Sequence, residues 1–289
     1  MNGLSPRLKA DLSMLFVAFI WGTTFVIVKN ALLEIGPFLY LGLRFLLAFA
    51  VLALLSPQNI GKVNRHSLTT GMIMGLVLLF GYAFQTVGLQ YTTSSNAGFI
   101  TGVSVVLVPI IYYSLRRRLP PTGTIFAVVS VTIGLYLLSV PNGLSSMAYG
   151  DLLILVCALC FAIHIVLVDL YSHLYNAIAI TGIQILFVGL VCLGIGLLIE
   201  PWPAKFSFSL IVAIIVTAVF ATALAFLIQN ALQKYSTPTR FAIVLTAEPV
   251  FAALAGYWCA GEMFSTKALI GASLILGSMI ISILSRRLA

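Results

Sequence analysis

Long apolar runs, bounded by charged residues, proline, glycine or asparagine, follow one another along almost the whole of this chain. Ten runs can be placed, at residues 12–32, 38–55, 68–89, 95–115, 122–140, 150–170, 177–199, 207–232, 239–260 and 266–284. Each is close to the ~20 residues that an α-helix needs to cross the hydrocarbon core of a bilayer. Lipid tolerates only helices or closed barrels, and the runs lack the alternation of a barrel strand. The pattern predicts an all-α integral membrane protein with ten transmembrane helices.

Composition indicates that lipid surrounds most of the chain. Of its 289 residues, 61% are hydrophobic and 8% are charged, whereas soluble domains have about 45–50% and about 25%. The formal net charge of +8 comes from basic residues that lie in twos and threes between apolar runs. Membrane topology explains this placement more simply than a nucleic-acid partner does. We therefore expect the lipid bilayer as a partner, and no nucleic acid.

The basic residues are divided unequally between the two sides that the ten runs define. If the N-terminus is inside, the inner side holds Arg7, Lys9, Lys62, Arg65, Arg116, Arg117, Arg118, Lys234, Arg240, Arg286 and Arg287. The outer side holds Lys29, Lys205 and Lys267, and Arg44 falls within a run. This positive-inside bias predicts that both termini are cytoplasmic. The sequence has no Asn-x-Ser/Thr sequon, which fits a bacterial plasma membrane.

The second half of the chain repeats the first. At an offset of 140 residues Trp21 corresponds to Phe161, Thr24 to His164, Lys29 to Asp169 and Arg44 to Gln184; at an offset of 144, Tyr82 corresponds to Phe226, Gln85 to Gln229 and Tyr91 to Tyr235. An odd number of helices in each copy places the second copy upside down in the membrane. We predict two inverted five-helix domains, at residues 1–140 and 141–289. Secondary transporters are often built in this way and bind substrate near the membrane midplane, between the repeats.

Short motifs in both halves resemble those of one transporter family. They are Phe19-Ile20-Trp21-Gly22, Gly42-Leu43-Arg44-Phe45, Ala231-Leu232-Gln233-Lys234-Tyr235-Ser236-Thr237-Pro238, Thr246-Ala247-Glu248-Pro249 and Gly261-Glu262. With these motifs the sequence resembles the drug/metabolite transporter superfamily, in its ten-helix EamA-type branch. In the first half, Ala97-Gly98-Phe99-Ile100-Thr101-Gly102 followed by Val106-Leu107-Val108-Pro109 resembles the subgroup of aromatic amino-acid exporters of the YddG type. The resemblance implies that the chain exports small amphiphilic molecules.

The first half departs from the family pattern in two respects. After the fourth run it has Arg116-Arg117-Arg118 in place of the acidic Gly-Glu of the family. Pro109 also lies one helical turn later than the alignment of Tyr91 with Tyr235 would place it. The two halves are therefore not interchangeable, and a symmetric mechanism cannot be assumed.

Four of the predicted helices carry an aromatic and a polar residue three positions apart. The pairs are Trp21 with Thr24, Tyr82 with Gln85, Phe161 with His164, and Phe226 with Gln229. This spacing puts both members on one helix face, and a polar face turned toward lipid is costly. We predict that the four faces line one central substrate-binding cavity, with Phe99 as a weaker candidate. The alternative is that Gln85, Gln229 and His164 only form hydrogen bonds between helices.

Three charged residues, Lys29, Arg44 and Glu248, lie within or near the spans, where charge is a functional candidate by default. Glu248 could carry a proton, because burial favours the neutral form of a carboxyl group. It also precedes Pro249, whose missing N–H loosens the helix, and an acidic residue before proline is a general feature of the family that the sequence resembles. We therefore predict gating or structural roles for these three residues and for Pro109 and Pro249.

Other classes of function fit the sequence less well. The sequence lacks the motifs of metalloproteases and serine hydrolases, and His66, His164 and His173 lack metal-ligand spacing, so we expect neither an enzyme nor a cofactor. A carrier of sugar phosphates or nucleotide sugars is the second choice, because the superfamily includes such members; phosphate, however, prefers several converging basic groups. Gly98 and Gly102 fit internal packing better than dimerisation. We predict a monomeric carrier that exports aromatic or large apolar amino acids, although an intramembrane enzyme remains the alternative from another class.

Overall fold

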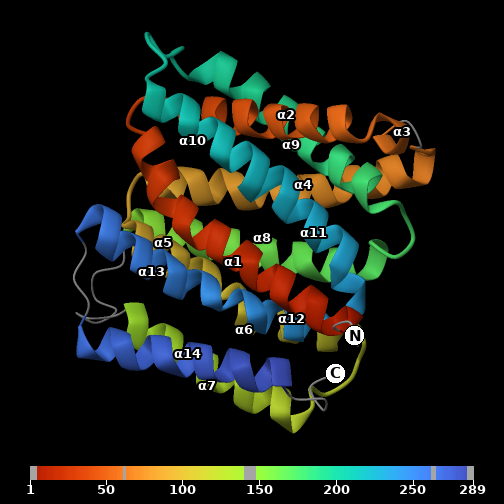
Figure 1. Cartoon of the computed structure of the whole chain (residues 1–289), viewed down its shortest axis with the longest axis vertical. Coiled ribbons are helices and arrows are strands. Elements are labelled where there is room, and N and C mark those ends of the chain that lie inside the picture. Colours follow the sequence, from red (N-terminus) through yellow and green to blue (C-terminus); the bar gives the residue numbers. More distant parts are fainter. Residues whose placement is uncertain (1–4, 61–62, 140–147, 262–264, 285–289) are drawn as a thin grey trace.

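The computed structural model describes residues 5–60, 63–139, 148–261 and 265–284, and every regular element in these ranges is a helix (Figure 1). The elements are α1 (Pro6–Ala31), α2 (Pro37–Leu55), α3 (Pro57–Ile60), α4 (Arg65–Leu89), α5 (Ser94–Gly102), α6 (Ser104–Leu115), α7 (Thr122–Ser139), α8 (Tyr149–Tyr171), α9 (Ala177–Ile199), α10 (Phe208–Ala218), the π-helix η2 (Val219–Leu224), α11 (Ala225–Leu232), the 3-10 helix η3 (Gln233–Tyr235), α12 (Pro238–Leu245), α13 (Ala247–Ala260) and α14 (Thr266–Leu284). The predicted all-α fold is confirmed. The predicted domain boundary between residues 140 and 141 lies outside the described residues.

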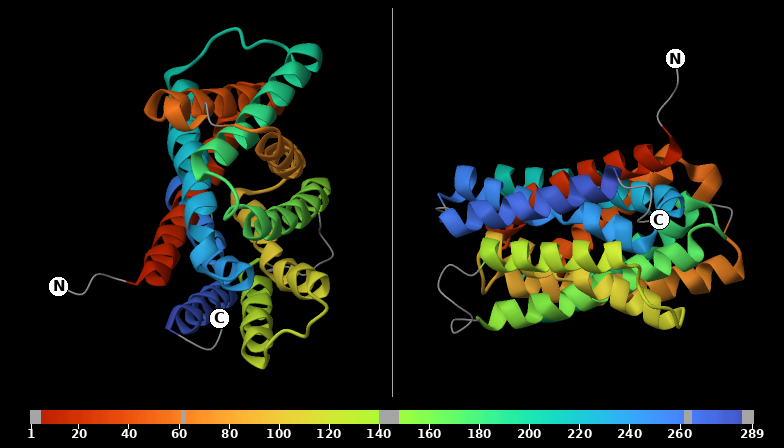
Figure 2. Two further views of the ribbon diagram at one scale, coloured as in Figure 1. Left: turned by 90° about the vertical axis from the view of Figure 1, so that its right-hand side faces the viewer. Right: turned by 90° about the horizontal axis from the view of Figure 1, so that it is seen from below.

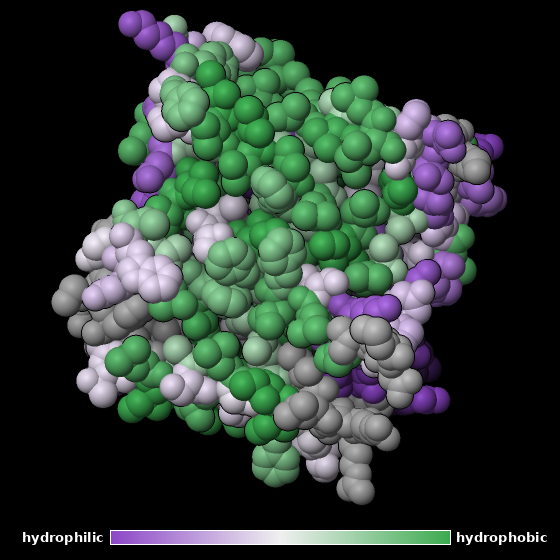
Figure 3. Space-filling view, in the orientation of Figure 1, coloured by the Kyte–Doolittle hydropathy of each residue, from purple (hydrophilic) through white to green (hydrophobic). Residues whose placement is uncertain are grey.

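The described helices account for the ten predicted spans. Eight segments are long and apolar enough to cross a membrane, and α7 and α14 contain two shorter apolar helices. On the face shown in Figure 3, apolar side chains cover the middle of the bundle and polar ones gather toward its ends. Large apolar side chains such as Phe16, Ile73 and Phe126 are 48%, 52% and 76% exposed. A surface this apolar is suited to contact with lipid chains.

Polar side chains fix where several helices begin. The N–H of Leu8 donates to Ser5 Oγ at 3.2 Å before α1, and the N–H of Ser67 donates to Asn64 Oδ1 at 2.7 Å before α4. Thr93 and Thr237 cap α5 and α12, which are corresponding helices of the two repeats. These caps satisfy N–H groups that have no partner within the helix.

The helices pack side by side, with α1 beginning and α14 ending at one end of the bundle (Figures 1 and 2). We call this end the terminal end and the other the opposite end. Corresponding helices of the two repeats pair at the two edges of the bundle. At one edge α2 packs closely on α9, since a Cβ added to Gly42 would lie 2.7 Å from the Cα of Leu193. At the other edge α7 packs closely on α14, since a Cβ added to Gly134 would lie 2.8 Å from the carbonyl oxygen of Gly271.

Three of the predicted continuous spans are interrupted within the bundle. Val103 separates α5 from α6, η2 lies between α10 and α11, and Thr246 separates α12 from α13. The break at Thr246 comes just before Pro249, whose missing N–H leaves the helical hydrogen bond to that turn unmade. The break at Val103 does not coincide with a proline, since Pro109 lies inside α6. Discontinuous helices near the midplane are typical of the binding regions of secondary transporters.

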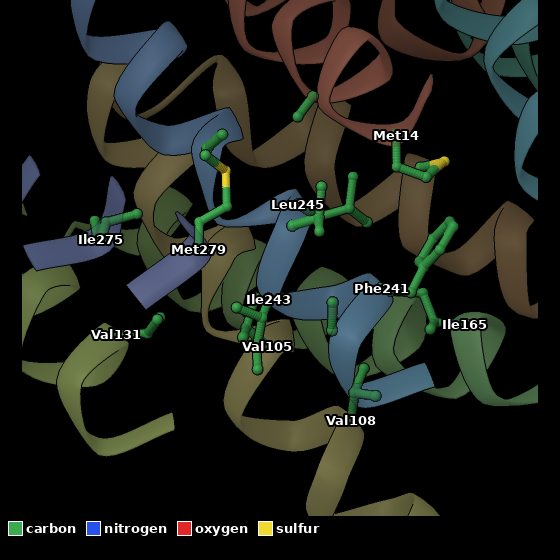
Figure 4. Close-up of a cluster of buried hydrophobic side chains, with 14 of the residues drawn as sticks. Met14, Val105, Val108, Val131, Ile165, Phe241, Ile243, Leu245, Ile275 and Met279 are labelled. Atoms are coloured by element: carbon green, nitrogen blue, oxygen red, sulfur yellow. The ribbon is translucent and has the colours of Figure 1, made fainter. Parts of the chain in front are cut away.

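A cluster of buried apolar side chains fills the bundle between its middle and its terminal end (Figure 4). Helix α12 contributes Phe241, Ile243 and Leu245, all at most 7% exposed. Around them lie Met14 of α1, Val105 and Val108 of α6, Val131 of α7, Ile165 of α8, and Ile275 and Met279 of α14. The short helix α12 is thus held from several sides by apolar contacts.

Candidate functional site

A central cavity lies between the two repeats. The volume that the centre of a water molecule can occupy in this cavity is about 60 Å³. Helices α1, α2, α4, α5 and α6 line it from the first repeat, and α8, α11, α12 and α13 line it from the second. All members of the four aromatic and polar pairs lie on its wall. The space is narrow, so a ligand larger than a few water molecules requires side chains or helices to move apart.

Aromatic rings from both repeats contact one another on the cavity wall. The ring centroids of Trp21 and Phe226 are 5.6 Å apart, and those of Tyr82 and Phe161 are 5.3 Å apart. Tyr82 and Phe226, which are 6.0 Å apart, connect the two pairs. Edge-to-face and tilted contacts of this kind are favourable between rings. We call Trp21, Tyr82, Phe161 and Phe226 the aromatic wall.

The polar members of the pairs differ in how they are bonded. His164 Nε2 lies 2.8 Å from Gln184 Oε1, and Gln85 Nε2 donates to Thr101 Oγ1 at 3.2 Å. Thr24 Oγ1 donates to the carbonyl of Trp21 in its own helix at 2.8 Å. In contrast, Gln229 Oε1 is buried and has no hydrogen-bond partner among the described residues. Hydrogen bonds between helices therefore account for His164 and in part for Gln85, but not for Gln229.

Arg44 is a buried basic residue on the cavity wall. It is 4% exposed, its Nε donates to Thr222 Oγ1 at 2.7 Å, and its Nη2 donates to the carbonyl of Ala221 at 3.4 Å. Its Cζ lies 5.0 Å from the centroid of the Tyr82 ring. All these partners are neutral, and within the described ranges no carboxylate pairs with Arg44.

The π-helix η2 supplies the carbonyl that Arg44 uses. The carbonyl oxygen of Ala221 in η2 also accepts a hydrogen bond from Trp21 Nε1 at 2.8 Å. Thr222 Oγ1 is held in turn by donating to the carbonyl of Thr217 at 2.9 Å. Single π-helical turns are rare in proteins as a whole, but those that occur often lie at functional sites. The turn here connects Trp21 and Arg44 of the first repeat to the second repeat.

Glu248 is an acidic residue on the same wall. It lies in the first turn of α13 and is 8% exposed. Helix α1 packs closely against its backbone, because a Cβ added to Gly22 would lie 2.5 Å from the carbonyl oxygen of Glu248. Among the described residues its carboxyl group has no hydrogen-bond or ion-pair partner. The cavity wall thus contains one buried basic residue and one buried acidic residue that do not pair with each other.

The cavity extends further toward the opposite end than toward the terminal end. Val28, Arg44, Thr86 and Leu89 line it on the opposite side. Their counterparts in the second repeat are Val168, Gln184, Asn230 and Gln233, which are outside the cavity and 0–1% exposed. Gln184 Nε2 donates to Asn230 Oδ1 at 3.3 Å, and Gln233 Nε2 donates to the carbonyl of Ile165 at 2.6 Å. Side chains and their hydrogen bonds therefore close the terminal side.

A buried ion pair holds the terminal end. Arg240 Nη2, at the start of α12, lies 2.6 Å from Asp11 Oδ2 near the start of α1, and the two side chains are 3% and 1% exposed. Arg240 Nε also donates to both carboxylate oxygens, so the guanidinium forms a fork on the carboxylate. At the opposite end the counterpart of Asp11 is Asp151, which accepts a hydrogen bond from Thr92 Oγ1 at 2.6 Å. The corresponding acidic residues at the two ends therefore have different partners, a guanidinium at the terminal end and a hydroxyl at the opposite end.

Four residues that were predicted to be functional lie off the cavity wall. Phe99 packs against the buried clusters, because α5 presents Thr101 and Gly102 to the cavity. Lys29 donates to the carbonyl of Thr92, Pro109 lies inside α6, and Pro249 packs against Gly102 of α5. The substrate-binding, gating and structural roles assigned from the sequence stay predictions.

The sequence analysis did not single out Asp11 and Arg240. It treated Arg240 only as part of the charge bias, although the residue is buried in an ion pair. The repeat contains a signal that could have found Asp11, since Asp151 stands at the corresponding position of the second half. An acidic residue near the start of the first helix of each repeat marks both ends of the bundle.

A membrane bundle of two inverted repeats, with helices broken near the middle and a cavity between the repeats, is typical of secondary transporters. The sequence model of the EamA-like transporter family matches residues 8–140 and 148–284. The chain belongs to this family, which confirms the predicted resemblance. It is a membrane transporter.

Relatives agree with this assignment, and a solved structure agrees with the fold. An uncharacterized transporter of Archaeoglobus fulgidus is 35% identical over 281 residues, which cover 95% of this chain and 86% of the relative. The uncharacterized transporter YoaV of Bacillus subtilis is 23% identical, covering 92% and 94%. A chloroplastic WAT1-related protein of Arabidopsis thaliana is 24% identical, covering 89% and 65%. One crystal structure matches with a TM-score of 0.79 at 18% identity, over 96% of this chain and 98% of the other, and so has the same fold.

Proposed function

We propose that this transporter exports aromatic or large apolar amino acids, or closely similar amphiphilic metabolites, across a bacterial plasma membrane by alternating access. The observation that carries the proposal is the cavity between the repeats, which combines the aromatic wall with polar and charged side chains. A ring stacked on this wall would gain on the order of 1 kcal/mol for each good aromatic contact. A small polar solute would gain no such contact.

The same cavity suits sugar phosphates and nucleotide sugars less well. Phosphate groups are bound best by several converging basic side chains. On the described cavity wall Arg44 is the only lysine or arginine, and Glu248 is the acidic residue. A phosphate would therefore meet one guanidinium and be repelled by the carboxylate when Glu248 is ionised.

The orientation and the transport cycle are also part of the proposal. The charge bias supports a cytoplasmic location for the terminal end, and we take the conformation described here as closed on that side. Export requires that the terminal end opens by separation of α12 from α1, while the opposite end closes around α4, α5 and α8. Rocking of one repeat against the other around a fixed site would produce both movements.

Transport by the purified protein tests the proposal. Proteoliposomes loaded with unlabelled L-phenylalanine should take up labelled L-phenylalanine from outside, with saturation and with acceleration by the internal amino acid. Saturable counterflow distinguishes a carrier from a channel. A panel with and without a pH gradient should include L-tryptophan, L-leucine, glycine and glucose 6-phosphate. If glucose 6-phosphate exchanges and no amino acid does, the proposal is wrong and the second-choice substrate class replaces it.

A further inference from the structure

We propose that Arg44 and Glu248 recognise the two charges of a zwitterionic ligand, Arg44 binding the carboxylate and Glu248 the ammonium group of a free α-amino acid. This inference rests on the proposed function and deepens it, because amphiphilic transport alone does not require both charges. It assigns to Arg44 and Glu248 a ligand-binding role in place of the gating or structural role that the sequence suggested.

The first observation is that the two charges face one cavity and are not neutralised by the protein. Arg44 bonds only to neutral partners, and the Glu248 carboxyl group has no partner among the described residues. A buried ion without a counter-ion is costly, whereas a paired one is tolerated. Among the other deeply buried charged residues that the structure describes, Asp11 and Arg240 pair with each other. Asp151 has neutral partners, since it accepts hydrogen bonds from Thr92 and from the N–H of Ala148, but the Glu248 carboxyl group has not even these.

The second observation is that both charges lie beside the aromatic wall. Arg44 and the Trp21 indole donate to the same carbonyl, that of Ala221. Gly22, the next residue in α1, packs on the backbone of Glu248. An aromatic amino acid carries its carboxylate and ammonium on one carbon close to its ring. A ring placed on the aromatic wall therefore brings both charged groups toward the part of the cavity where Arg44 and Glu248 lie.

The third observation is a neutral hydrogen-bond acceptor, the side-chain oxygen of Gln229, on the same cavity wall. An ammonium group has three N–H donors, so one carboxylate leaves donors that need other oxygen atoms. Gln229 Oε1 is a buried acceptor on the cavity wall without a partner among the described residues. Buried polar atoms of this kind call for an explanation, and a ligand ammonium group supplies one.

Recognition of both charges predicts a defined selectivity. A ligand that lacks its carboxylate leaves Arg44 without a counter-ion, and one that lacks its ammonium leaves Glu248 without one. We expect 2-phenylethylamine and 3-phenylpropionate, which keep the ring of phenylalanine, to inhibit exchange of labelled L-phenylalanine at least about tenfold more weakly than L-phenylalanine itself. These measurements use the wild-type protein in proteoliposomes and need no variant.

Two variants then assign each preference to its residue. Arg44→Gln should lose the preference for phenylalanine over 2-phenylethylamine and keep the preference over 3-phenylpropionate. Glu248→Gln should lose the preference for phenylalanine over 3-phenylpropionate and keep the preference over 2-phenylethylamine. Lys205→Gln and Glu34→Gln change exposed charges outside the cavity, and as matched controls they should keep both preferences. Thermal unfolding in detergent checks each variant for folding, and Arg44→Met, which removes the charge but keeps a long apolar side chain, replaces Arg44→Gln if that protein is unstable.

The outcomes separate this inference from the proposed function. The inference is supported if the wild type discriminates against both analogues and each variant loses only its own preference. If the wild type exchanges phenylalanine without such discrimination, or both variants keep both preferences, the zwitterion site is wrong and the proposed function stands. If no amino acid is exchanged at all, both are wrong.

Discussion

Gln85 is the residue whose role in the cavity can be tested with least risk to the fold. Its side chain is only partly buried and makes one hydrogen bond, to Thr101. We expect Gln85→Ala to raise the L-phenylalanine concentration that gives half-maximal exchange by roughly 3- to 10-fold. This corresponds to the loss of one neutral hydrogen bond of about 0.5–1.5 kcal/mol. The melting temperature in detergent should stay near that of the wild type. Gln90→Ala, an exposed residue at the end of α4, is the control; equal effects of the two changes would mean that Gln85 does not contact substrate.

Tyr82 tests the aromatic wall itself. Its ring contacts Phe45, Phe161 and Phe226, and it is 4% exposed. Tyr82→Phe keeps the ring and should exchange phenylalanine normally. Tyr82→Ala removes a buried ring and should cost about 3–5 kcal/mol of stability, so a loss of transport in that variant alone would be uninformative. Tyr82→Leu, which keeps apolar volume without the ring, should reduce exchange of phenylalanine more than exchange of leucine; equal reduction would argue against ring stacking.

The sequence predicted the cavity residues better than their partners. The aromatic and polar pairs could be found because a spacing of three along one helix is a local pattern, and the repeat doubled the signal. The bond from Arg44 to Thr222 and the pair of Asp11 with Arg240 join residues far apart in the chain. No local periodicity encodes which helix packs against which, so these contacts could not be predicted from one sequence.

The close contact between α1 and α13 depends on a missing side chain. A Cβ added at Gly22 would lie 2.5 Å from the carbonyl oxygen of Glu248 and 2.9 Å from the backbone nitrogen of Ala252. Because these are backbone atoms, Gly22→Ala must push the two helices apart, and we expect a loss of about 1–3 kcal/mol of stability. Gly194→Ala in α9 is the matched control, since an added Cβ there meets nothing within 4 Å. Thermal unfolding of both variants in detergent measures the difference, and equal melting temperatures would contradict the packing described here.

Helix positions were predictable, but helix continuity was not. Apart from the start of the first run, which lies six residues after the start of α1, the ten apolar runs lie within about three residues of the observed spans, because hydrophobic length directly reflects bilayer thickness. Pro249 gave a local reason for the break at Thr246. The break at Val103 and the π-helix η2 have no such residue, since Pro109 lies within α6 and η2 contains neither proline nor glycine. Their geometry depends on packing between the repeats, which the local sequence does not contain.

The membrane orientation of the whole bundle can be tested by chemical labelling. The charge bias predicts that Asn64 is cytoplasmic and that Ala204, in the loop between α9 and α10, is outside. In a cysteine-free background, Ala204→Cys should react with an impermeant thiol reagent added to intact cells, and Asn64→Cys only after the cells are opened. The reverse pattern would overturn the assignment of the terminal end to the cytoplasm. Ser146 would report on the outer side as well, but it lies outside the described residues.

Closure of the terminal end should depend on the Asp11–Arg240 pair. Asp11→Asn leaves the Arg240 guanidinium buried without its carboxylate, a change that typically costs about 3–5 kcal/mol. We expect the terminal end to open more often, which would raise the rate at which a cysteine at position 239, beside Arg240, is labelled from that side. Thr239 is 2% exposed in the structure, so slow labelling is expected when the pair is intact. Glu34→Gln is the control, and an unchanged labelling rate in Asp11→Asn would show that the pair does not hold the end closed.

Among the described residues the buried ion pair lies at the terminal end, and this position also bears on how the carrier responds to solute concentration. A transporter that rests with one side shut presents its site mainly to the other, and the affinity measured from the shut side is weaker by the fraction of time that side is open. Asp11 and Arg240 would change how often each side is open, and would leave the concentration ratio reached at equilibrium unchanged. With the terminal end in the cytoplasm, half-saturation from inside would therefore need a higher concentration than from outside. The carrier would then export little amino acid while its cytoplasmic concentration is low, and much more once that concentration rises.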